Sequence, residues 1–357
     1  VLFLLIFMYV GWPQLLRGRR HADVLARLNP FLLVLAIGLE LLSLLSYTVL
    51  TRVTLPAKPH LSLFTLFRIQ MSTKALGNLV PGGSAAGGTL GYRLLTAADV
   101  PGPAAGFSLA TVGLASAVVL NLMLWVALVV SIPFNGFSRT YVIVAIVGVF
   151  IMAAAAGLVL LLMRGADMAE TVFRAIARRV PLVDEETASR VVHQIAARLH
   201  DLAGQPELIR RGALWAAANW TLDAATLWVF VRAFSGQAMN PVNLLVAYGV
   251  ANVLAAIPLT PGGLGVVEAT LTPTLVSFGV PITEATIAVL AWRVAQFWLP
   301  IPIGGIAYGS LRFGQLGRRS GVDRAVKAPL AEGAERRVWD EATGEYRVVR
   351  PSDGSAA

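Results

Sequence analysis

Six long apolar segments constrain the fold of this chain more than any other feature of its sequence. A helix that spans a membrane needs about 20 mostly apolar residues, and these segments meet or nearly meet that length. Only 14% of the 357 residues are charged, whereas a soluble domain carries about 25%. We therefore expect an all-helical, polytopic membrane protein. The expected spans are 1–16, 30–50, 101–131, 140–163, 211–234 and 283–311.

Two further apolar stretches, 61–98 and 241–279, are each interrupted at the centre by Pro-Gly-Gly. Proline stops a helix and glycine permits a sharp bend, so each stretch is predicted to form two half-helices that meet inside the membrane. Broken backbone at that depth is tolerated only where protein buries it or where it lines a wet cavity. The two interruptions are Pro81-Gly82-Gly83 and Pro261-Gly262-Gly263.

A constant offset of 180 residues relates these two stretches. It superimposes the two Pro-Gly-Gly motifs and also places Val100-Pro101 on Val280-Pro281. We therefore predict an internal repeat with units 30–131 and 211–311, each a span, a broken re-entrant hairpin and a span. The single span between the units would turn the second one upside down, which is a recurring plan of transporters.

Basic residues predict which ends of the bundle face the cytoplasm. Segment 164–211 carries eight arginines and the segment 312–327 carries five positive charges, so both are predicted to be cytoplasmic. The same topology places the basic loop 17–27 outside, against the rule. Either that loop is an exception or one hairpin crosses the membrane fully. Because Val1 already lies in an apolar run, we expect the natural N-terminus to lie upstream.

The predicted transmembrane domain 1–312 includes one connector that does not span the membrane, and a polar tail follows the domain. The connector 164–210 carries an apolar stripe among charges, which suits a helix on the cytoplasmic membrane surface or a simple connector packed on the bundle. The segment 313–357 is polar and without a period, so we expect a disordered tail.

The half-helix that begins after each Pro-Gly-Gly motif is the expected functional centre. Its first amides lack partners within the helix, and the helix dipole places partial positive charge at that end. Such an end attracts a phosphate or a carboxylate, and glycine lets the backbone approach the ligand. Two such ends facing each other would form a centre that receives anions. Gly83, Gly87 and Gly91 also form a face that allows another helix to approach closely.

Ionisable residues inside apolar segments are costly and therefore candidates for function. Arginine and lysine near the motifs would hold a headgroup phosphate, although snorkelling to the interface is the alternative. Glu268 would stabilise its helix end, pair with an arginine or take up a proton. Asp223 and Glu40 lie on equivalent helices at positions that are not equivalent. The basic candidates are Arg68, Lys74, Arg93 and Arg293. The predicted substrate-binding residues are Pro81, Gly82, Gly83, Ser84, Arg93, Pro261, Gly262, Gly263, Gly265, Glu268 and Arg293.

Several chemistries find no support in the sequence. The chain has no cysteine, and its four histidines lie outside the expected spans, so we predict no metal site and no cofactor. The stretch 82–89 approaches a phosphate-binding loop, but Gly88 stands where that motif requires lysine. No nucleophile elbow is present and no basic face alternates with aromatic residues. We therefore expect that the chain is not an enzyme and does not bind nucleic acid.

With both motifs in view, the chain resembles flippase-like membrane proteins related to the N-terminal region of lysylphosphatidylglycerol synthases. The strongest match is the segment Ile257 to Glu268, followed by Trp292-Arg293 and by Pro300 and Pro302. The segment Asn78 to Arg93 looks like its counterpart, and the resemblance covers about residues 1–315.

The resemblance implies that the chain moves a polar lipid between leaflets, with Glu268 and Arg93 in the functional centre. Family members often carry an acidic residue soon after the first motif, where this chain has Gly87 and Gly88. The soluble aminoacyl-transferring domain of the synthases is absent, so lipid synthesis is not expected.

These observations lead to one expected function and two alternatives. We expect translocation of a phospholipid derivative or lipid-linked sugar in the plasma (inner) membrane of a bacterium. The alternatives are a secondary transporter of a small anion and a non-transporting membrane partner of a lipid synthase. The expected partners are membrane lipids, with a lipid-modifying enzyme or a second copy of the chain as further candidates.

Overall fold

The computed structural model describes residues 29–56, 59–80, 83–135, 205–255, 260–313, 336–340 and 345–349, together with residues 146, 149, 153 and 157. The expected spans 1–16 and 140–163 and the connector 164–210 fall wholly or largely outside these residues. The described part of the transmembrane domain is helical, which confirms the predicted all-α membrane class.

The first half contains four helices whose ends follow from local sequence. These are α4 (Pro30–Thr54), α5 (Leu63–Leu79), α6 (Gly83–Ala97) and α7 (Gly102–Asn135). The side chain of Asn29 accepts a hydrogen bond from the Phe31 amide and caps α4. Ser62 caps α5 in the same way through the Thr65 amide. Proline directly follows the cap of α4, where its missing N–H has no effect on the helix.

The second half contains α11 (Pro206–Ser235), α12 (Pro241–Ala255), the short 3₁₀ turn η2 (Pro261–Gly263), α13 (Val266–Ser277), α14 (Ile282–Arg293), the π-helical segment η3 (Val294–Trp298) and α15 (Pro300–Phe313). The helices α14 and α15 continue each other through η3, so that residues 282–313 form one long element. Gly236 ends α11 in the left-handed conformation, which glycine adopts without a steric penalty.

Element boundaries in the two halves keep the offset found in the sequence. The helices α6 and α13 end at Ala97 and Ser277, and α7 and α14 begin at Gly102 and Ile282, each pair 180 residues apart. The helices α4 and α5 correspond to α11 and α12 with boundaries that deviate from this offset by up to four residues. The secondary structure of the two halves therefore follows one pattern.

Three described helices are long and apolar enough to cross a membrane: Pro30–Thr54, Gly102–Ile132 and Ile282–Phe313. They correspond to three of the expected spans. The helix α11 covers the expected span 211–234 with 30 residues but is less apolar, because Asn219 and Asp223 interrupt it. Both polar residues find hydrogen-bond partners inside the bundle.

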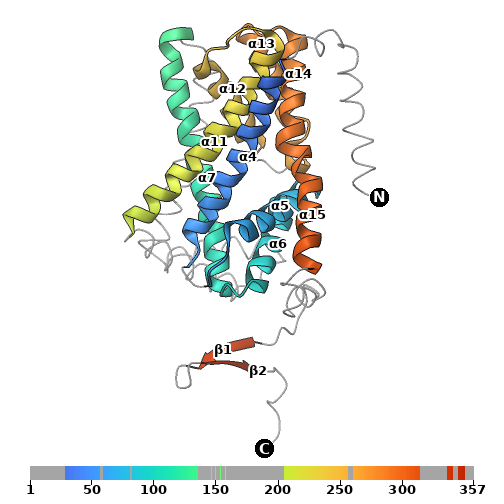
Figure 1. The fold of residues 1–357 in the computed structure, drawn as a ribbon. Helices are drawn as coiled ribbons and strands as arrows, with labels where there is room; N and C mark the ends of the chain where they lie inside the picture. Colours follow the sequence, from blue (N-terminus) through green and yellow to red (C-terminus); the bar gives the residue numbers. More distant parts are fainter. Residues whose placement is uncertain are drawn as a thin grey trace, which may run out of the picture.

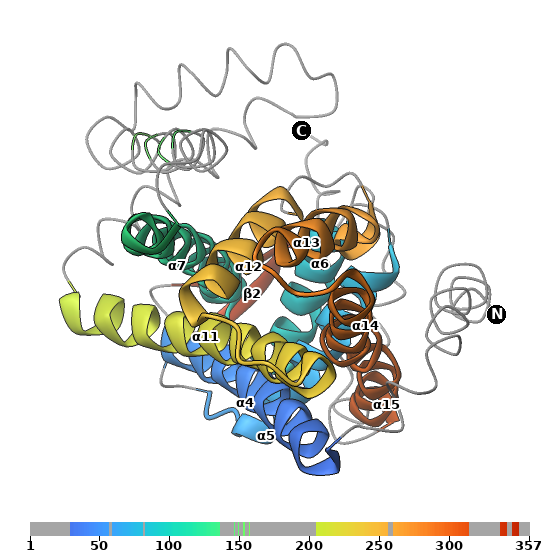
Figure 2. The ribbon, with the colours of Figure 1, turned by 90° about the horizontal axis from the view of Figure 1, so that it is seen from above.

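The helices α4 and α11 lie side by side along one face of the bundle and run antiparallel to each other (Figures 1 and 2). Ser43 contacts Asn219, whereas the earlier residue Ala36 contacts the later residue Thr226. The first hairpin, α5 and α6, lies toward one end of the bundle, and α12 and α13 lie toward the other (Figure 1). Each hairpin packs against the long helix of the other half, α5 on α15 and α12 on α7. Seen from above, the helices surround the bundle axis (Figure 2).

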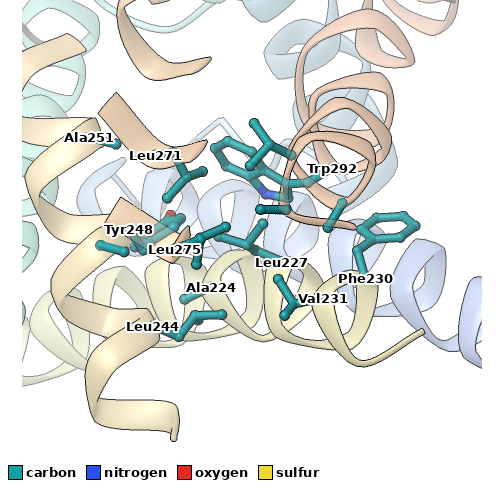
Figure 3. Packing of buried hydrophobic residues seen from close by; sticks show 14 of the residues in the cluster. Ala224, Leu227, Phe230, Val231, Leu244, Tyr248, Ala251, Leu271, Leu275 and Trp292 are labelled. Carbon is teal, nitrogen blue, oxygen red and sulfur yellow. The ribbon is translucent and has the colours of Figure 1, made fainter. Parts of the chain in front are cut away.

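The largest apolar cluster lies where α11, α12, α13 and α14 meet (Figure 3). Leu227, Leu271 and Leu275 are fully buried there, around the rings of Tyr248 and Trp292. These two rings meet edge to face with their centroids 5.9 Å apart. The cluster holds the second hairpin against α11 and buries the polar atoms of both rings.

Ten residues of the tail 313–357, which was predicted to be disordered, form two β-strands. Strands β1 (Arg336–Asp340) and β2 (Glu345–Val349) pair antiparallel, with Val338 opposite Arg347 and Trp339 opposite Tyr346. Valine, tryptophan and tyrosine favour extended backbone, and the intervening Gly344 suits a turn. The strands were not predicted because most residues in the surrounding segment are charged or small, which is typical of disorder. The other residues of 314–357 lie outside the described part of the chain.

Candidate functional site at the hairpin tips

The first broken stretch forms two helices, as predicted: α5 ends at Leu79 and α6 begins at Gly83. A methyl group built on Gly83 would lie only 1.7 Å from the carbonyl oxygen of Gly77 on α5. One on Gly87 would meet the carbonyl oxygen of Thr73 at 2.9 Å. The predicted glycine face of α6 is therefore confirmed, and its partner is the other arm of the same hairpin. Pro81, Gly82 and the side chain of Ser84 lie outside the described residues.

The second hairpin bends through three glycines in conformations that other residues rarely adopt. Gly262, Gly263 and Gly265 have φ values of +54°, +68° and +83°. A methyl group on Gly262 would lie 2.3 Å from the ring of Phe297, and one on Gly263 would lie 2.8 Å from the methyl group of Ala255. Both the backbone conformation and the close packing therefore require glycine in this motif.

Glu268 and Arg293 form an ion pair that fixes this bend to the last long element. The Arg293 Nε donates to Glu268 Oε1 over 2.8 Å, and another guanidinium nitrogen donates to the carbonyl oxygen of Gly262 over 3.0 Å. The second carboxylate oxygen of Glu268 accepts the backbone N–H of Gly265 over 2.7 Å. Arg293 is 2% exposed. Two of the roles considered for Glu268, helix capping and arginine pairing, are thus both fulfilled.

The tips of the two hairpins meet on the π-helical segment η3. Leu79, at the end of α5, and Leu264, after the second motif, pack on the same buried group of Phe297, Trp298 and Ile301. The side chain of Asn78 donates to the carbonyl oxygen of Phe297 over 2.9 Å. The helix α5 also contacts η2 directly. The two broken elements, which are far apart in the sequence, therefore converge inside the bundle.

Two buried carboxyl groups, Glu40 on α4 and Asp223 on α11, come together in the bundle and interact electrostatically. Asp223 accepts hydrogen bonds of 2.7 Å from the hydroxyl of Tyr248 and from Nε1 of Trp292. Glu40 is 1% exposed, and no N–H or O–H among the described residues donates a hydrogen bond to its carboxyl oxygens. The charge of Lys74 on α5 acts on Glu40 from the first hairpin.

The basic candidates separate into different environments. Arg293 is paired, and Arg68 donates to the hydroxyl of Ser310 over 2.8 Å and lies over the ring of Phe64. Lys74 and Arg93 are half-buried, and the structure shows neither in an ion pair among the described residues. Neither of these two cations is therefore neutralised by direct contact with a carboxylate.

The family model of the lysylphosphatidylglycerol synthase TM region matches residues 1–304, which is most of the chain. The chain belongs to this family. The match confirms the resemblance inferred from the two Pro-Gly-Gly motifs and identifies a membrane domain related to lipid handling. A search of curated proteins finds no match.

Within this family framework, the two hairpin tips are not chemically equivalent. At the N-terminus of α13, the carboxylate of Glu268 accepts the N–H of Gly265 and places a negative charge at this helix end. The first turn of α6 contains no acidic residue. The half-buried cations Lys74 and Arg93 also belong to the first hairpin. Positive charge that remains available for an anion is thus concentrated on the first hairpin.

Sequence reasoning identified part of this site and missed the rest. Gly262, Gly265, Glu268 and Arg293 were predicted and lie together. Arg93 was predicted but is not among the contacts of this group. The pairing of Glu40 with Asp223 was missed, although each residue stood out as a charge inside an apolar helix. The π-helical segment was also missed, and its only signal was the closely spaced Pro300 and Pro302.

Proposed function

We propose that this chain translocates a polar or anionic lipid across the bilayer, with the headgroup passing between the two hairpin tips. The observation that carries the proposal is the convergence of both tips on the η3 segment. Membership in a family related to lipid handling supports a lipid as the substrate. The headgroup would move through the bundle while the acyl chains stay in the bilayer. The proposal includes no catalytic step.

This function requires two hairpins that enter the membrane from opposite sides, so we propose an inverted repeat of two units with re-entrant hairpins. Three observations support it: the equal spacing of element boundaries, the antiparallel arrangement of α4 and α11, and the hairpins at opposite ends of the bundle (Figure 1). In this arrangement the chain crosses the plasma membrane of a bacterium several times. Broken backbone is then buried by the other half, as a membrane interior demands.

Lys74 and Arg93 supply the proposed grip on an anionic headgroup. An ionised side chain inside a membrane bundle is costly, so cations without a carboxylate partner mark a path for charged groups. The buried hydroxyl of Thr260, directly before the second motif, has no hydrogen-bond partner among the described residues. A headgroup between the tips would contact cations on the first hairpin and a hydroxyl on the second.

The test is lipid exchange in liposomes that contain the purified full chain. Fluorescent phosphatidylglycerol and phosphatidylcholine are placed in both leaflets, and the loss of fluorescence to an impermeant reductant reports movement between leaflets. We expect faster exchange of the anionic lipid. Lys74→Gln and Arg93→Gln should each slow it by about tenfold, the effect of losing one charge-assisted hydrogen bond. Arg211→Gln serves as the control, because Arg211 is exposed and pairs with Glu207 outside the site.

The outcomes also separate the alternatives. Exchange no faster than in empty liposomes for phosphatidylglycerol, an aminoacylated phospholipid and a lipid-linked sugar would refute the proposal. Uptake of a soluble anion such as phosphate, without lipid exchange, would instead indicate a small-anion transporter. Neither activity, together with co-purification of a lipid-modifying enzyme, would indicate a non-transporting partner.

A further inference from the structure

Glu40 and Asp223 are buried acidic groups that the proposed lipid path does not use, and Glu40 is the one that receives no hydrogen bond from a described residue. It lies near the middle of α4 and is 1% exposed. No N–H or O–H within the described part of the chain donates to either of its oxygens. An ionised carboxylate in such surroundings has neither solvent nor donors to stabilise it.

The ionisable groups around Glu40 come from three elements, α5, α11 and α12. Asp223 on α11 and Lys74 on α5 act on it electrostatically, and Tyr248 on α12 lies beside the same pair. Arg68 is also on α5 but is directed to Ser310. The other neighbours of α4, which are α7 and η3, contribute no ionisable side chain, because none occurs in their sequences.

Glu40 and Asp223 are two acidic groups that interact inside an apolar bundle, so ionising both would place like charges side by side. Asp223 accepts hydrogen bonds from Tyr248 and Trp292, whereas no donor among the described residues reaches the oxygens of Glu40. Arg293 and Glu268 balance each other in their ion pair, so Arg293 does not serve the two carboxyl groups. One proton carried by Glu40 removes the repulsion and gives Glu40 a hydrogen to donate to Asp223.

We infer that Glu40 and Asp223 form a proton-binding site that holds one proton on Glu40 at neutral pH. Lys74 connects this site to the first hairpin, because it is part of α5. Movement of that hairpin changes the distance between its ammonium group and Glu40. An approach of Lys74 favours release of the proton to water, and its withdrawal favours uptake. Resting on the proposed function, the inference adds that lipid translocation is coupled to the movement of a proton.

The first experiment detects the proton without any transport. Infrared spectra of the reconstituted full chain at neutral pH should contain the C=O stretching band of a protonated carboxyl group, because surface carboxylates are ionised there. The band should disappear in Glu40→Gln and change its pH dependence in Asp223→Asn. It should be unchanged in Glu207→Gln, which alters an exposed carboxylate outside the bundle. Absence of the band from the wild-type protein, or its persistence in Glu40→Gln, would overturn the inference.

The second experiment tests the coupling. A pH gradient imposed across the liposomes should change the rate of phosphatidylglycerol exchange at least twofold in the wild-type protein and leave it unchanged in Glu40→Gln. A wild-type exchange rate that does not change with the pH gradient would refute the coupling. If the wild-type chain moved no lipid at all, the proposed function would fail while the infrared band still decided the proton site.

Discussion

At the scale of single residues, Arg293 shows how one side chain fixes the bend between two half-helices. Its guanidinium group reaches Glu268, the carbonyl of Gly262 and the side chain of Gln296, and it lies 4.8 Å from the ring centre of Phe297. The planar guanidinium group presents several donors in fixed directions and stacks on rings, which the point charge of lysine does not reproduce. The bend after the second motif is therefore tied to the last long element by one residue.

Arg293→Ala should lower the free energy of unfolding by about 3 kcal/mol, because it leaves the half-buried Glu268 without its counter-charge. Arg293→Lys should recover only part of this loss. Unfolding of the purified protein in detergent micelles, followed by the fluorescence of its tryptophans, provides the measurement. Arg211→Ala is the control and should change stability by less than about 0.5 kcal/mol, since its side chain is 63% exposed. Equal effects of the two alanine variants would contradict the structural role of the pair.

Glu40 illustrates the opposite case, a buried polar group whose oxygens receive no hydrogen bond from a donor among the described residues. Glu40→Met keeps a similar volume and removes this buried carboxyl group and its repulsion with Asp223, so it should raise the free energy of unfolding by about 1 kcal/mol. The same unfolding measurement applies. Glu268→Met should lower stability instead, because Glu268 caps α13 and pairs with Arg293. A loss of stability in Glu40→Met comparable with that of Glu268→Met would show that Glu40 has a stabilising contact after all.

At the scale of elements, the last long helix changes its hydrogen-bonding pattern where both hairpins reach it. The prolines at positions 300 and 302 have no N–H, so carbonyl groups in the turn before them lose their usual donors. The chain responds with the wider π turn, in which the amide of Leu299 donates to the carbonyl oxygen of Val294 over 2.8 Å. The widened segment places Phe297 against Gly262 and its carbonyl oxygen against Asn78.

The first hairpin depends on backbone contact between its arms, which a pair of alanine substitutions tests. Gly83→Ala places a methyl group on the carbonyl of Gly77 and must force the arms apart, at a cost of about 2 kcal/mol or more. Gly88→Ala lies on the same helix with nothing within 4 Å, so it should be neutral or stabilising by up to about 1 kcal/mol. Thermal unfolding in micelles compares the two variants. Similar midpoints would show that the arms do not touch in the membrane.

At the scale of the whole molecule, each half of the chain packs its hairpin against a helix of the other half. Each hairpin packs on the long helix of the other half, while α4 and α11 pack on each other along one face of the bundle. Polar contacts along α5 and α15, from Asn78 to Phe297 at one end and from Arg68 to Ser310 at the other, connect the halves over the length of the hairpin arm. Neither half could therefore bury its hairpin alone.

The inverted arrangement predicts that equivalent loops face opposite sides of the membrane. The chain contains no cysteine, so a single introduced cysteine reports its own position. His60→Cys lies before α5 and Gln237→Cys lies before α12, both at exposed positions. In sealed membrane vesicles of one orientation, an impermeant maleimide should label one variant from outside, and the other only after the vesicles are opened. Labelling of both from the same side would contradict the inverted repeat.

The sequence by itself determined the membrane class, the places where helices break and the residues of the second motif. These features depend on short-range chemistry, because apolar length, proline and glycine act within a few residues of the chain. Only the tertiary structure decided that Glu40 meets Asp223, that Arg293 pairs with Glu268, and that both tips meet on η3. Such contacts depend on how helices far apart in the chain cross and on which side chains face each other there. No local pattern in the sequence specifies that register.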